Sequence, residues 1–175
     1  VSLYTSNYQL RLDKTAYVLN TGQIPLTKSR YLKYATKEEH PYGENAIVAI
    51  MCYSGYNVED AVIFNEASLK RGIFRTTYFN MYEDHEEIEK IGNLSVESKF
   101  MNVEENNVIG KKAGYDYSQL DKKTGIIKEN SVVTEKTILI GKGSNSITAL
   151  GTYVDNSKGT KKGQVGVVDK SFITK

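Results

Sequence analysis

The sequence predicts a mainly β fold with one or two short helices. Its apolar residues fall in short runs rich in β-branched and aromatic side chains, and turn residues bound these runs. Hydrophobic residues make up 39% of the 175 residues, which is enough for a packed core. No repeat of fixed period and no heptad pattern is present. No apolar run reaches about 18 residues, so we expect no membrane-spanning segment and no membrane partner.

The N-terminal part is expected to contain short strands. Residues 1–34 alternate loosely between apolar and polar side chains, first around Leu10 and Leu12 and again at residues 17–19. Such alternation is typical of strands with one buried face. Pro25 has no backbone N–H, which excludes that position from a central strand.

Two further strands are predicted on either side of an acidic turn. Residues 45–53 contain an unbroken apolar run, which is typical of a strand buried on both faces. Residues 61–64 form a second apolar run. Between them, residues 54–57 have turn composition, and the two carboxylates of Glu59 and Asp60 follow.

A short helix and another strand are expected next. Asn65 is a favourable N-cap, Glu66 suits the positive end of a helix, and Gly72 suits its C-terminal stop. These signals predict a helix over residues 66–71. Residues 74–82 alternate aromatic and threonine side chains, which predicts a strand.

The C-terminal half shows weaker signals. Residues 83–87 form an acidic run that we expect to be solvated. Strand-like stretches occur at residues 125–127 and 137–140, and residues 164–173 carry another strand signal. Residues 143–148 are rich in Gly, Ser and Asn, which predicts a loop.

Charge is unevenly distributed along the chain. The formal net charge is only +2, yet residues 61–110 hold five basic and nine acidic side chains. Residues 111–175 hold twelve basic and six acidic side chains. A basic C-terminal third fits either contact with phosphate or a solvated lysine-rich surface, and both readings stay open.

The single cysteine indicates a reducing compartment, because it has no internal disulfide partner. Cys52 lies in an apolar run, and we expect it to be a small buried hydrophobe rather than a nucleophile. His40 and His85 are too few and too scattered for a zinc site, so no zinc is expected.

The adjacent carboxylates of Glu59 and Asp60 are the main candidates for chemistry. Successive side chains of an extended segment point in opposite directions, so one carboxylate can face a cleft while the other braces the turn. Carboxylates between buried strands need partners such as Arg, backbone N–H groups or Mg²⁺. The residues alone leave two readings open, a metal or phosphate site and a salt-bridged or capping pair.

The stretch GENAIVAIMCYSGYNVEDAVI at residues 43–63, with NEASLKRGIFR at residues 65–75, resembles the second-largest (beta-like) subunit of multisubunit DNA-directed RNA polymerase. Cys-Tyr-Ser-Gly at residues 52–55 resembles the eukaryotic, archaeal and large-DNA-virus branch, because the bacterial branch tends to have Pro-Trp-Asn before its Gly-Tyr-Asn. Looser likeness continues along the whole chain.

The resemblance implies an internal fragment of that subunit. Residues 1–85 would be part of the hybrid-binding region that bears a double-psi β-barrel, and residues 86–175 an inserted β-rich wall or flap-like domain. The family's two active-site lysine segments, its triphosphate-binding arginine and its zinc-binding clamp lie outside this sequence. We therefore expect the fragment to be inactive alone.

The resemblance also implies roles for the acidic turn. Asp60 would help to position the second Mg²⁺, which arrives with the nucleoside triphosphate, and Glu59 would support that site, weakly or indirectly. Gly55, Tyr56 and Asn57 would shape the turn, with Tyr56 packed in the barrel.

Two arginines are further candidates. Arg71 and Arg75 would reach phosphate or the largest subunit, with ion pairing at the helix end as the alternative.

The implied function is template-directed RNA synthesis from nucleoside triphosphates with Mg²⁺, as part of a nucleotidyltransferase complex. The implied partners are the largest subunit, other polymerase subunits, the DNA template and the RNA–DNA hybrid. The chain would act in the nucleus of a eukaryote, or in the cytoplasm, virus factory or virion of a virus. One alternative is a non-catalytic β-domain that binds nucleic acid or a transcription factor. Another is an independent Mg²⁺-dependent hydrolase, which would need more acidic ligands than Glu59 and Asp60.

Overall fold

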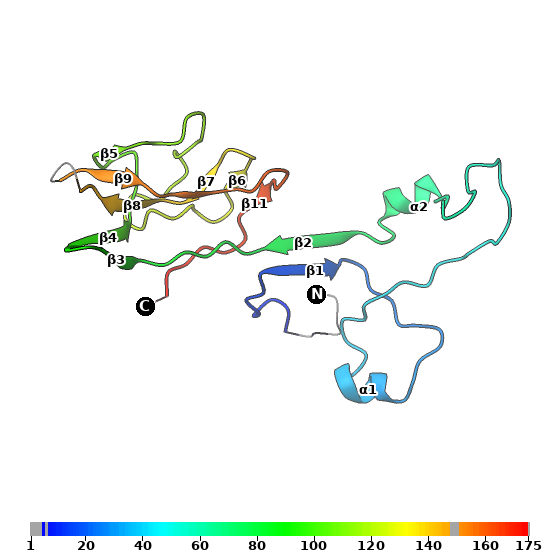
Figure 1. Cartoon of the computed structure of the whole chain (residues 1–175). Coiled ribbons are helices and arrows are strands. Elements are labelled where there is room, and N and C mark those ends of the chain that lie inside the picture. The colour runs from blue at the N-terminus through cyan, green and yellow to red at the C-terminus, as the bar shows by residue number, and fades with distance from the viewer. Residues whose placement is uncertain (1–4, 6, 148–150, 175) are drawn as a thin grey trace. The chain divides into compact units, whose positions relative to one another are not determined.

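A computed structural model describes residues 5, 7–147 and 151–174, and the chain divides into two compact units. The first unit is Val1–Met81 and the second is Tyr82–Lys175. The predicted fold class is confirmed, because short strands dominate and the described residues contain two short helices (Figure 1).

The first unit is built on a two-stranded antiparallel sheet. Strand β1 (Thr15–Leu19) pairs with β2 (Thr76–Asn80), and the two lie side by side in Figure 1. Tyr17 lies opposite Tyr78, and their ring centroids are 4.9 Å apart. The strands predicted at residues 17–19 and 74–82 are therefore confirmed. The structure shows no strand at Leu10 and Leu12, where residues 7–10 form turns instead.

The two helices are short, and one was expected. Helix α2 (Glu66–Arg71) is confirmed with both of its caps. The side chain of Asn65 accepts a hydrogen bond from Ser68 N, and Gly72 takes a left-handed φ of 102° at the C-cap. Helix α1 (Tyr31–Thr36) was not predicted. Among the described residues, neither helix is long and apolar enough to cross a membrane.

The two strands predicted around the acidic turn are wrong. Residues 45–53 and 61–64 have irregular backbone, and no described strand pairs with either. Ile47 and Ile50 are 104% and 99% exposed, rather than buried on two faces. An apolar run becomes a strand only where a neighbouring strand completes its backbone hydrogen bonds, and the described part of the first unit places no strand beside either run. Cys52 is also exposed, so its expected burial is wrong for the same reason.

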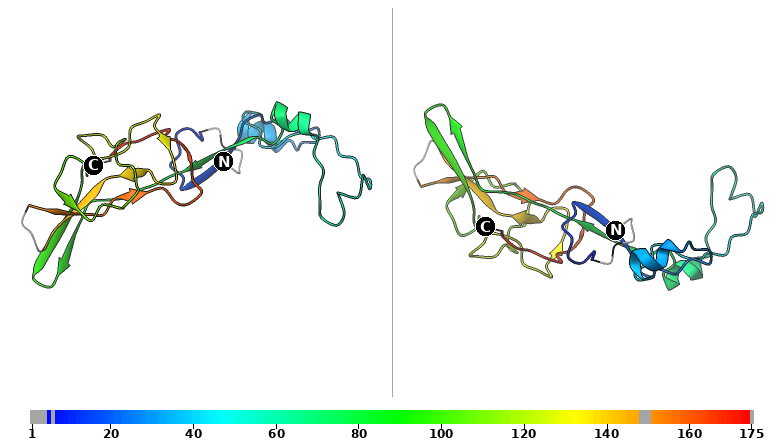
Figure 2. Two further views of the ribbon diagram at one scale, coloured as in Figure 1. Left: turned by 90° about the horizontal axis from the view of Figure 1, so that it is seen from above. Right: turned by 90° about the horizontal axis from the view of Figure 1, so that it is seen from below.

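The second unit contains a five-stranded sheet in the order β3-β4-β8-β9-β5. Its strands are β3 (Glu87–Ile91), β4 (Leu94–Phe100), β8 (Lys142–Asn145), β9 (Tyr153–Asp155) and β5 (Val108–Ile109). All neighbours are antiparallel except β5 and β9. The β3–β4 hairpin extends beyond the other strands of this unit (Figure 2). Strand β8 corrects the predicted loop at residues 143–148, of which Thr148 lies outside the described residues.

Two small ribbons complete the second unit. Strand β7 (Ile138–Ile140) pairs with β10 (Lys158–Gly159), and β6 (Val132–Val133) pairs with β11 (Gly166–Val167). The strand signals at residues 137–140 and 164–173 are thus confirmed in β7 and β11. Residues 125–127 form only isolated bridges, in which Ile126 pairs with Ile140 and Ile127 with Leu120.

The buried hydrophobic core that the structure describes lies entirely in the second unit. Its members are Val103, Val108, Tyr117, Leu120, Ile127, Val133, Ile138, Leu139 and Ile140. Backbone passes close to backbone beside this core, because a Cβ at Gly141 would lie 2.3 Å from Met101 O. A Cβ at Gly125, whose φ is +70°, would lie 2.5 Å from the same oxygen. Only glycine fits these two positions without a shift of the backbone.

Candidate functional site

The acidic turn lies in a long exposed loop between Asn45 and Asn65. Glu59 and Asp60 are both exposed, and neither makes a side-chain hydrogen bond or ion pair within the described residues. Glu59 has a φ of 56°, a left-handed conformation that is uncommon for a side chain other than glycine. Strained backbone of this kind gathers at functional sites. The structure therefore presents two unpaired carboxylates on a conformationally unusual turn.

Asn57 holds the preceding turn together. Its side-chain oxygen accepts a hydrogen bond from Tyr53 N at 3.0 Å, and its amide nitrogen donates to Met51 O at 2.6 Å. Ser54 and Gly55 follow with φ values of 57° and 73°. These bonds fix a tight reversal of the chain just ahead of the acidic pair. Tyr56 is 81% exposed, so within the described residues it does not pack in a core.

The N-terminal end of the loop is anchored by side chains that bond to backbone. Asn45 N donates to the Gln23 side chain at 2.9 Å, and the Asn45 amide donates to Ile24 O at 3.0 Å. Gln23 N donates to Gly43 O at 2.8 Å. This anchor holds one end of the loop, while residues 46–64 other than Asn57 lie exposed.

The C-terminal end of the loop is anchored near α2. Phe74 N donates to the Glu44 carboxylate at 2.9 Å, which ties the start of the loop to the chain after the helix. Phe64 packs edge-on against Phe74, with ring centroids 6.0 Å apart. The loop that carries Glu59 and Asp60 is therefore closed at its base and open along its length.

The two candidate arginines flank the end of α2 without ion pairs among the described residues. Arg71 donates to the Ser68 hydroxyl at 3.1 Å, and Arg75 N donates to Gly72 O at 3.2 Å. Within this helix, Lys70 forms an ion pair with Glu66 at 2.7 Å. The arginine side chains are exposed and are not brought into contact with Glu59 or Asp60 by any described interaction.

The donor set suits a hard cation but does not complete a site. Carboxylate oxygens are ligands that Mg²⁺ prefers, and a Mg²⁺ bound by protein takes only one or two of them with water and substrate phosphates. No group of three or more His, Cys, Asp or Glu side chains that could hold a metal ion occurs in the described parts of the chain. Glu59 and Asp60 therefore suit a Mg²⁺ whose other ligands come from water, substrate or another chain.

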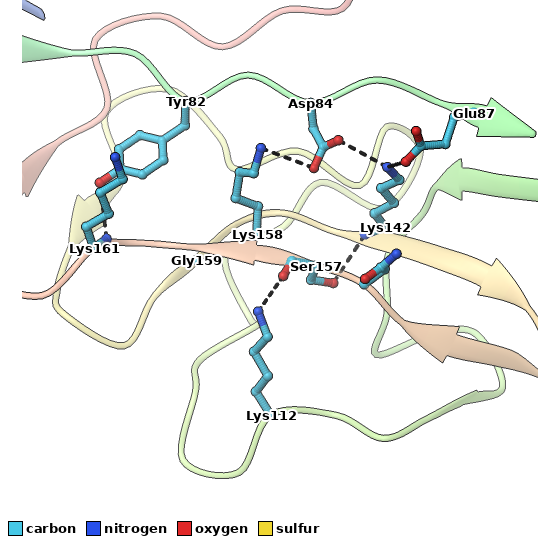
Figure 3. A pocket seen from close by; sticks show the side chains of 10 residues that line it. Tyr82, Asp84, Glu87, Lys112, Lys142, Ser157, Lys158, Gly159 and Lys161 are labelled. Carbon is cyan, nitrogen blue, oxygen red and sulfur yellow. Dashed lines mark hydrogen bonds and ion pairs between the residues drawn. The ribbon is translucent and has the colours of Figure 1, made fainter. Parts of the chain in front are cut away.

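A second polar cluster lies in the second unit and was not predicted. The Lys142 side chain is 4% exposed, and its Nζ pairs with Asp84 at 3.1 Å and Glu87 at 3.0 Å (Figure 3). Lys158 pairs with Asp84 at 3.4 Å. The acidic run at residues 83–87 was expected to be solvated, and for Asp84, which is 13% exposed, this is wrong.

The charged groups of this cluster shift one another's pKa values. Burial raises the pKa of Asp84, but hydrogen bonds from His85 N and Lys142 outweigh it and leave the pKa below its ordinary value. The hydrogen bond from Lys142 lowers the pKa of Glu87. Burial lowers the pKa of Lys142, yet the bonds to Glu87 and Asp84 leave it raised. All three groups are therefore held in their charged forms.

A buried tyrosine extends the polar network. Tyr117 donates its hydroxyl hydrogen to Asp155 at 2.6 Å and accepts a bond from Lys112 N at 2.9 Å. Burial, followed by the bond to Asp155, raises the pKa of Tyr117 to about 12. Asp155 also accepts from Ser157 N at 3.0 Å. These bonds fix the segment between β9 and β10.

Comparison with known proteins assigns the chain to a family. Residues 1–175 match the family model described as RNA polymerase Rpb2, domain 6. The chain is 36% identical over 183 residues to DNA-directed RNA polymerase II subunit RPB2 of Schizosaccharomyces pombe, covering 99% of this chain and 15% of that protein. It is 37% identical over 182 residues to DNA-directed RNA polymerase subunit Rpo2 of Sulfolobus acidocaldarius, covering 99% of this chain and 16% of that protein.

A plant relative agrees with these two. DNA-directed RNA polymerase II subunit 2 of Arabidopsis thaliana is 36% identical over 181 residues, covering 99% of this chain and 15% of that protein. The class of protein is thus a β-rich segment of the kind found in the second subunit of RNA polymerases. The chain belongs to the Rpb2 domain 6 family of the second-largest RNA polymerase subunit, and it spans about 15% of the length of the curated relatives that it matches.

Proposed function

We propose that this chain contributes the Glu59–Asp60 turn to template-directed RNA synthesis, as one segment of a DNA-directed RNA polymerase. The observation that supports this most directly is the family match over the whole chain, together with two exposed and unpaired carboxylates on a left-handed turn. The segment acts only within the full complex, because two acids do not make a complete site for phosphoryl transfer.

The carboxylates act on the metal that accompanies the nucleotide. Mg²⁺, when bound, neutralises negative charge on the triphosphate and on the leaving pyrophosphate. Asp60 would supply an oxygen ligand, and Glu59, its neighbour on the same turn, would add negative charge beside it. Because few ligands come from this chain, the largest subunit holds most of the shared site. Weak binding of this Mg²⁺ suits an ion that must leave with the pyrophosphate product in each cycle.

The neighbouring residues support the turn. Asn57 fixes its approach through bonds to Tyr53 and Met51, and Gly55 supplies the left-handed backbone. Arg71 and Arg75 are exposed guanidinium groups that suit contact with phosphate or with the largest subunit.

The two compact units correspond to two regions of the subunit. The unit Val1–Met81 carries the acidic turn and belongs to the barrel-bearing region, and the unit Tyr82–Lys175, with its own sheet and core, belongs to the wall. The partners are the largest subunit, the other polymerase subunits, the DNA template, the RNA–DNA hybrid and nucleoside triphosphates. The complex works in the nucleus of a eukaryote, or in the cytoplasm or virus factory for a viral enzyme.

The test is single-nucleotide addition by the assembled polymerase across a range of Mg²⁺ concentrations. Asp60→Asn keeps the shape of the side chain and removes its charge. We expect at least about a tenfold slower addition at low Mg²⁺, with partial recovery at high Mg²⁺, because a positioned ligand to a catalytic metal is lost. Glu59→Gln should give a smaller loss.

The matched control is Glu66→Gln, which removes an exposed carboxylate from the first turn of α2. It should leave the rate and its Mg²⁺ dependence unchanged. Equal rates for Asp60→Asn and the wild type at every Mg²⁺ concentration would overturn the proposed role.

A further inference from the structure

The two chain segments at the base of the exposed loop are joined by the half-buried side chain of Glu44. Its neighbours Gly43 and Asn45 both bond to Gln23, which fixes the backbone just before the loop. The Glu44 carboxylate accepts a hydrogen bond from Phe74 N at 2.9 Å, 30 residues further along the chain. A bond to a carboxylate is stronger than one to a neutral acceptor. Glu44 therefore couples the entry of the loop to the chain beyond α2.

The residue that Glu44 holds has an unusual backbone conformation. Phe74 has a φ of 56°, in the left-handed region that a bulky side chain rarely adopts. Such a conformation persists only where the surrounding contacts determine it. Here Phe74 N donates to Glu44, and on the next peptide Arg75 N donates to Gly72 O. The bond to Glu44 is thus part of what selects this conformation.

The ring of Phe74 carries the constraint to the exit of the loop. Phe64 packs edge-on against Phe74, with ring centroids 6.0 Å apart. Phe64 also directly precedes Asn65, the N-cap of α2, so the exit of the loop is held on both sides. Three residues separate Asp60 from Phe64. A path of contacts therefore runs from Glu44 through Phe74 and Phe64 to the acidic turn.

We propose that Glu44 is a positioning residue for the acidic turn. By holding Phe74, it fixes Phe64 at the exit of the loop and so limits where Asp60 can lie. This inference rests on the proposed function, because it assigns Glu44 to the same reaction. Without the bond, residues 46–64 would sample more conformations, and only a fraction of these would present Asp60 to Mg²⁺. The apparent affinity for the ion would fall by that fraction, whereas enzyme that has bound the ion would react normally.

The experiment measures single-nucleotide addition by the assembled polymerase across Mg²⁺ concentrations. Glu44→Ala removes the acceptor for Phe74 N. We expect the half-saturating Mg²⁺ concentration to rise about threefold to tenfold, with a rate at saturating Mg²⁺ close to that of wild type. Glu44→Gln keeps an oxygen acceptor at the same reach and should restore the wild-type value. Glu39→Ala, which removes an exposed carboxylate from the same unit, is the matched control and should change neither quantity.

A second measurement does not depend on catalysis. Hydrogen exchange of the Phe74 amide in the same complexes should be about fivefold faster in Glu44→Ala than in wild type, because the amide loses one hydrogen bond. Glu44→Gln should keep the wild-type exchange rate.

If Glu44→Ala does not assemble, Phe64→Leu decides. This change keeps an apolar side chain and removes the contact between the two rings. It should raise the half-saturating Mg²⁺ concentration about twofold or more.

An unchanged Mg²⁺ dependence in assembled Glu44→Ala, or in Phe64→Leu where that variant decides, overturns the proposal. So does a Glu44→Gln enzyme that is as impaired as Glu44→Ala. These outcomes are separate from the test of the acidic turn. A normal Glu44→Ala enzyme beside a slow Asp60→Asn enzyme rejects only the positioning role. A normal Asp60→Asn enzyme rejects the proposed function itself, even where the Phe74 amide exchanges faster in Glu44→Ala.

Discussion

The exposed loop at residues 46–64 and the β7 strand of the second unit have similar composition and opposite environments. Ile50 is 99% exposed in the loop, whereas Ile138 is fully buried in β7. Both lie in short β-branched apolar runs. Strand β7 has a ribbon partner in β10 and a packed core beneath it, and the loop has neither among the described residues. A short apolar run is therefore not sufficient for burial. Whether it is buried depends on the strands and core residues that pack against it.

The comparison also separates two kinds of polar site. In the second unit, Lys142, Asp84 and Glu87 satisfy one another, so their charges stabilise the fold. In the loop, Glu59 and Asp60 stay unpaired and exposed. Unpaired carboxylates on a turn with a fixed base are available to bind a ligand or partner. Carboxylates that already pair with a buried lysine are not.

The largest expected effect comes from truncating the core. Ile138→Ala should destabilise the second unit by about 3 kcal/mol, because it leaves a cavity at a fully buried position. Ile50→Ala, the same change at an exposed position, should alter stability by less than about 0.5 kcal/mol. Denaturant unfolding of the 175-residue chain measures both. Similar losses for the two variants would contradict the contrast between the regions.

Removing the buried lysine should have the next largest effect. Lys142→Met keeps the length of the side chain and leaves Asp84 without its main cation. We expect a loss of about 2 kcal/mol, less than for a fully buried pair, because water reaches Glu87. The same unfolding measurement applies. Lys99→Met, which removes an exposed pair with Glu97, is the control and should have little effect.

Acid should weaken the second unit through the same cluster. Folding lowers the pKa of Asp84 and of Glu87, so their contribution is fully present above the ordinary carboxyl pKa of about 4. It is lost as pH falls through the lower values of the folded state. Unfolding measured between about pH 6 and pH 2 should show this loss in the wild type and a shallower one in Lys142→Met. If the stability of the wild type and of Lys142→Met fell in parallel with pH, the cluster would not be the source of the acid sensitivity.

Alkali should act on the tyrosine network. Folding raises the pKa of Tyr117 to about 12. Its contribution to the free energy of unfolding is therefore present below the ordinary pKa of about 10 and is lost as pH rises toward 12. The ultraviolet absorbance of phenolate should show one tyrosine that titrates late, and Tyr117→Phe should remove that step. Retention of the late step in the variant would assign it to another tyrosine.

The smallest effect should come from the helix cap. Asn65→Ala removes the acceptor for Ser68 N and should cost about 1 kcal/mol of local stability in α2. Asn65→Asp keeps an oxygen acceptor at the N-cap and should retain the stability of α2. Hydrogen exchange of the amides in α2 is the measurement, and equal protection in all three chains would mean that the cap is not important.

Local signals in the sequence predicted local structure well. Asn65 and Gly72 marked both ends of α2, because caps depend on neighbouring residues alone. The strands of the β1–β2 ribbon were indicated by alternation at residues 17–19 and 74–82. The buried strands predicted at residues 45–53 and 61–64 were wrong, because burial depends on pairing that lies outside a local pattern. The β3–β4 hairpin was missed since its charged residues mask the alternation.

The candidate sites also divide into those that neighbouring residues reveal and those that depend on tertiary contacts. The Glu59–Asp60 turn was predicted as a site from adjacent carboxylates and from the family-like residues around them, and its role stays a prediction. The Lys142 cluster was missed because Lys142 and Asp84 are far apart in sequence and meet only through β8 and the segment before β3. The one available signal was the pairing of an acidic run at residues 83–87 with a basic C-terminal third.

The most direct test of the central claim compares catalysis with assembly in one preparation of the complete polymerase. Asp60→Ala should slow nucleotide addition per assembled enzyme by at least about tenfold while the yield of assembled enzyme stays close to that of wild type. That result would place Asp60 in the chemistry of RNA synthesis. A normal rate per assembled enzyme with a reduced yield would make the turn an assembly contact and would contradict the account.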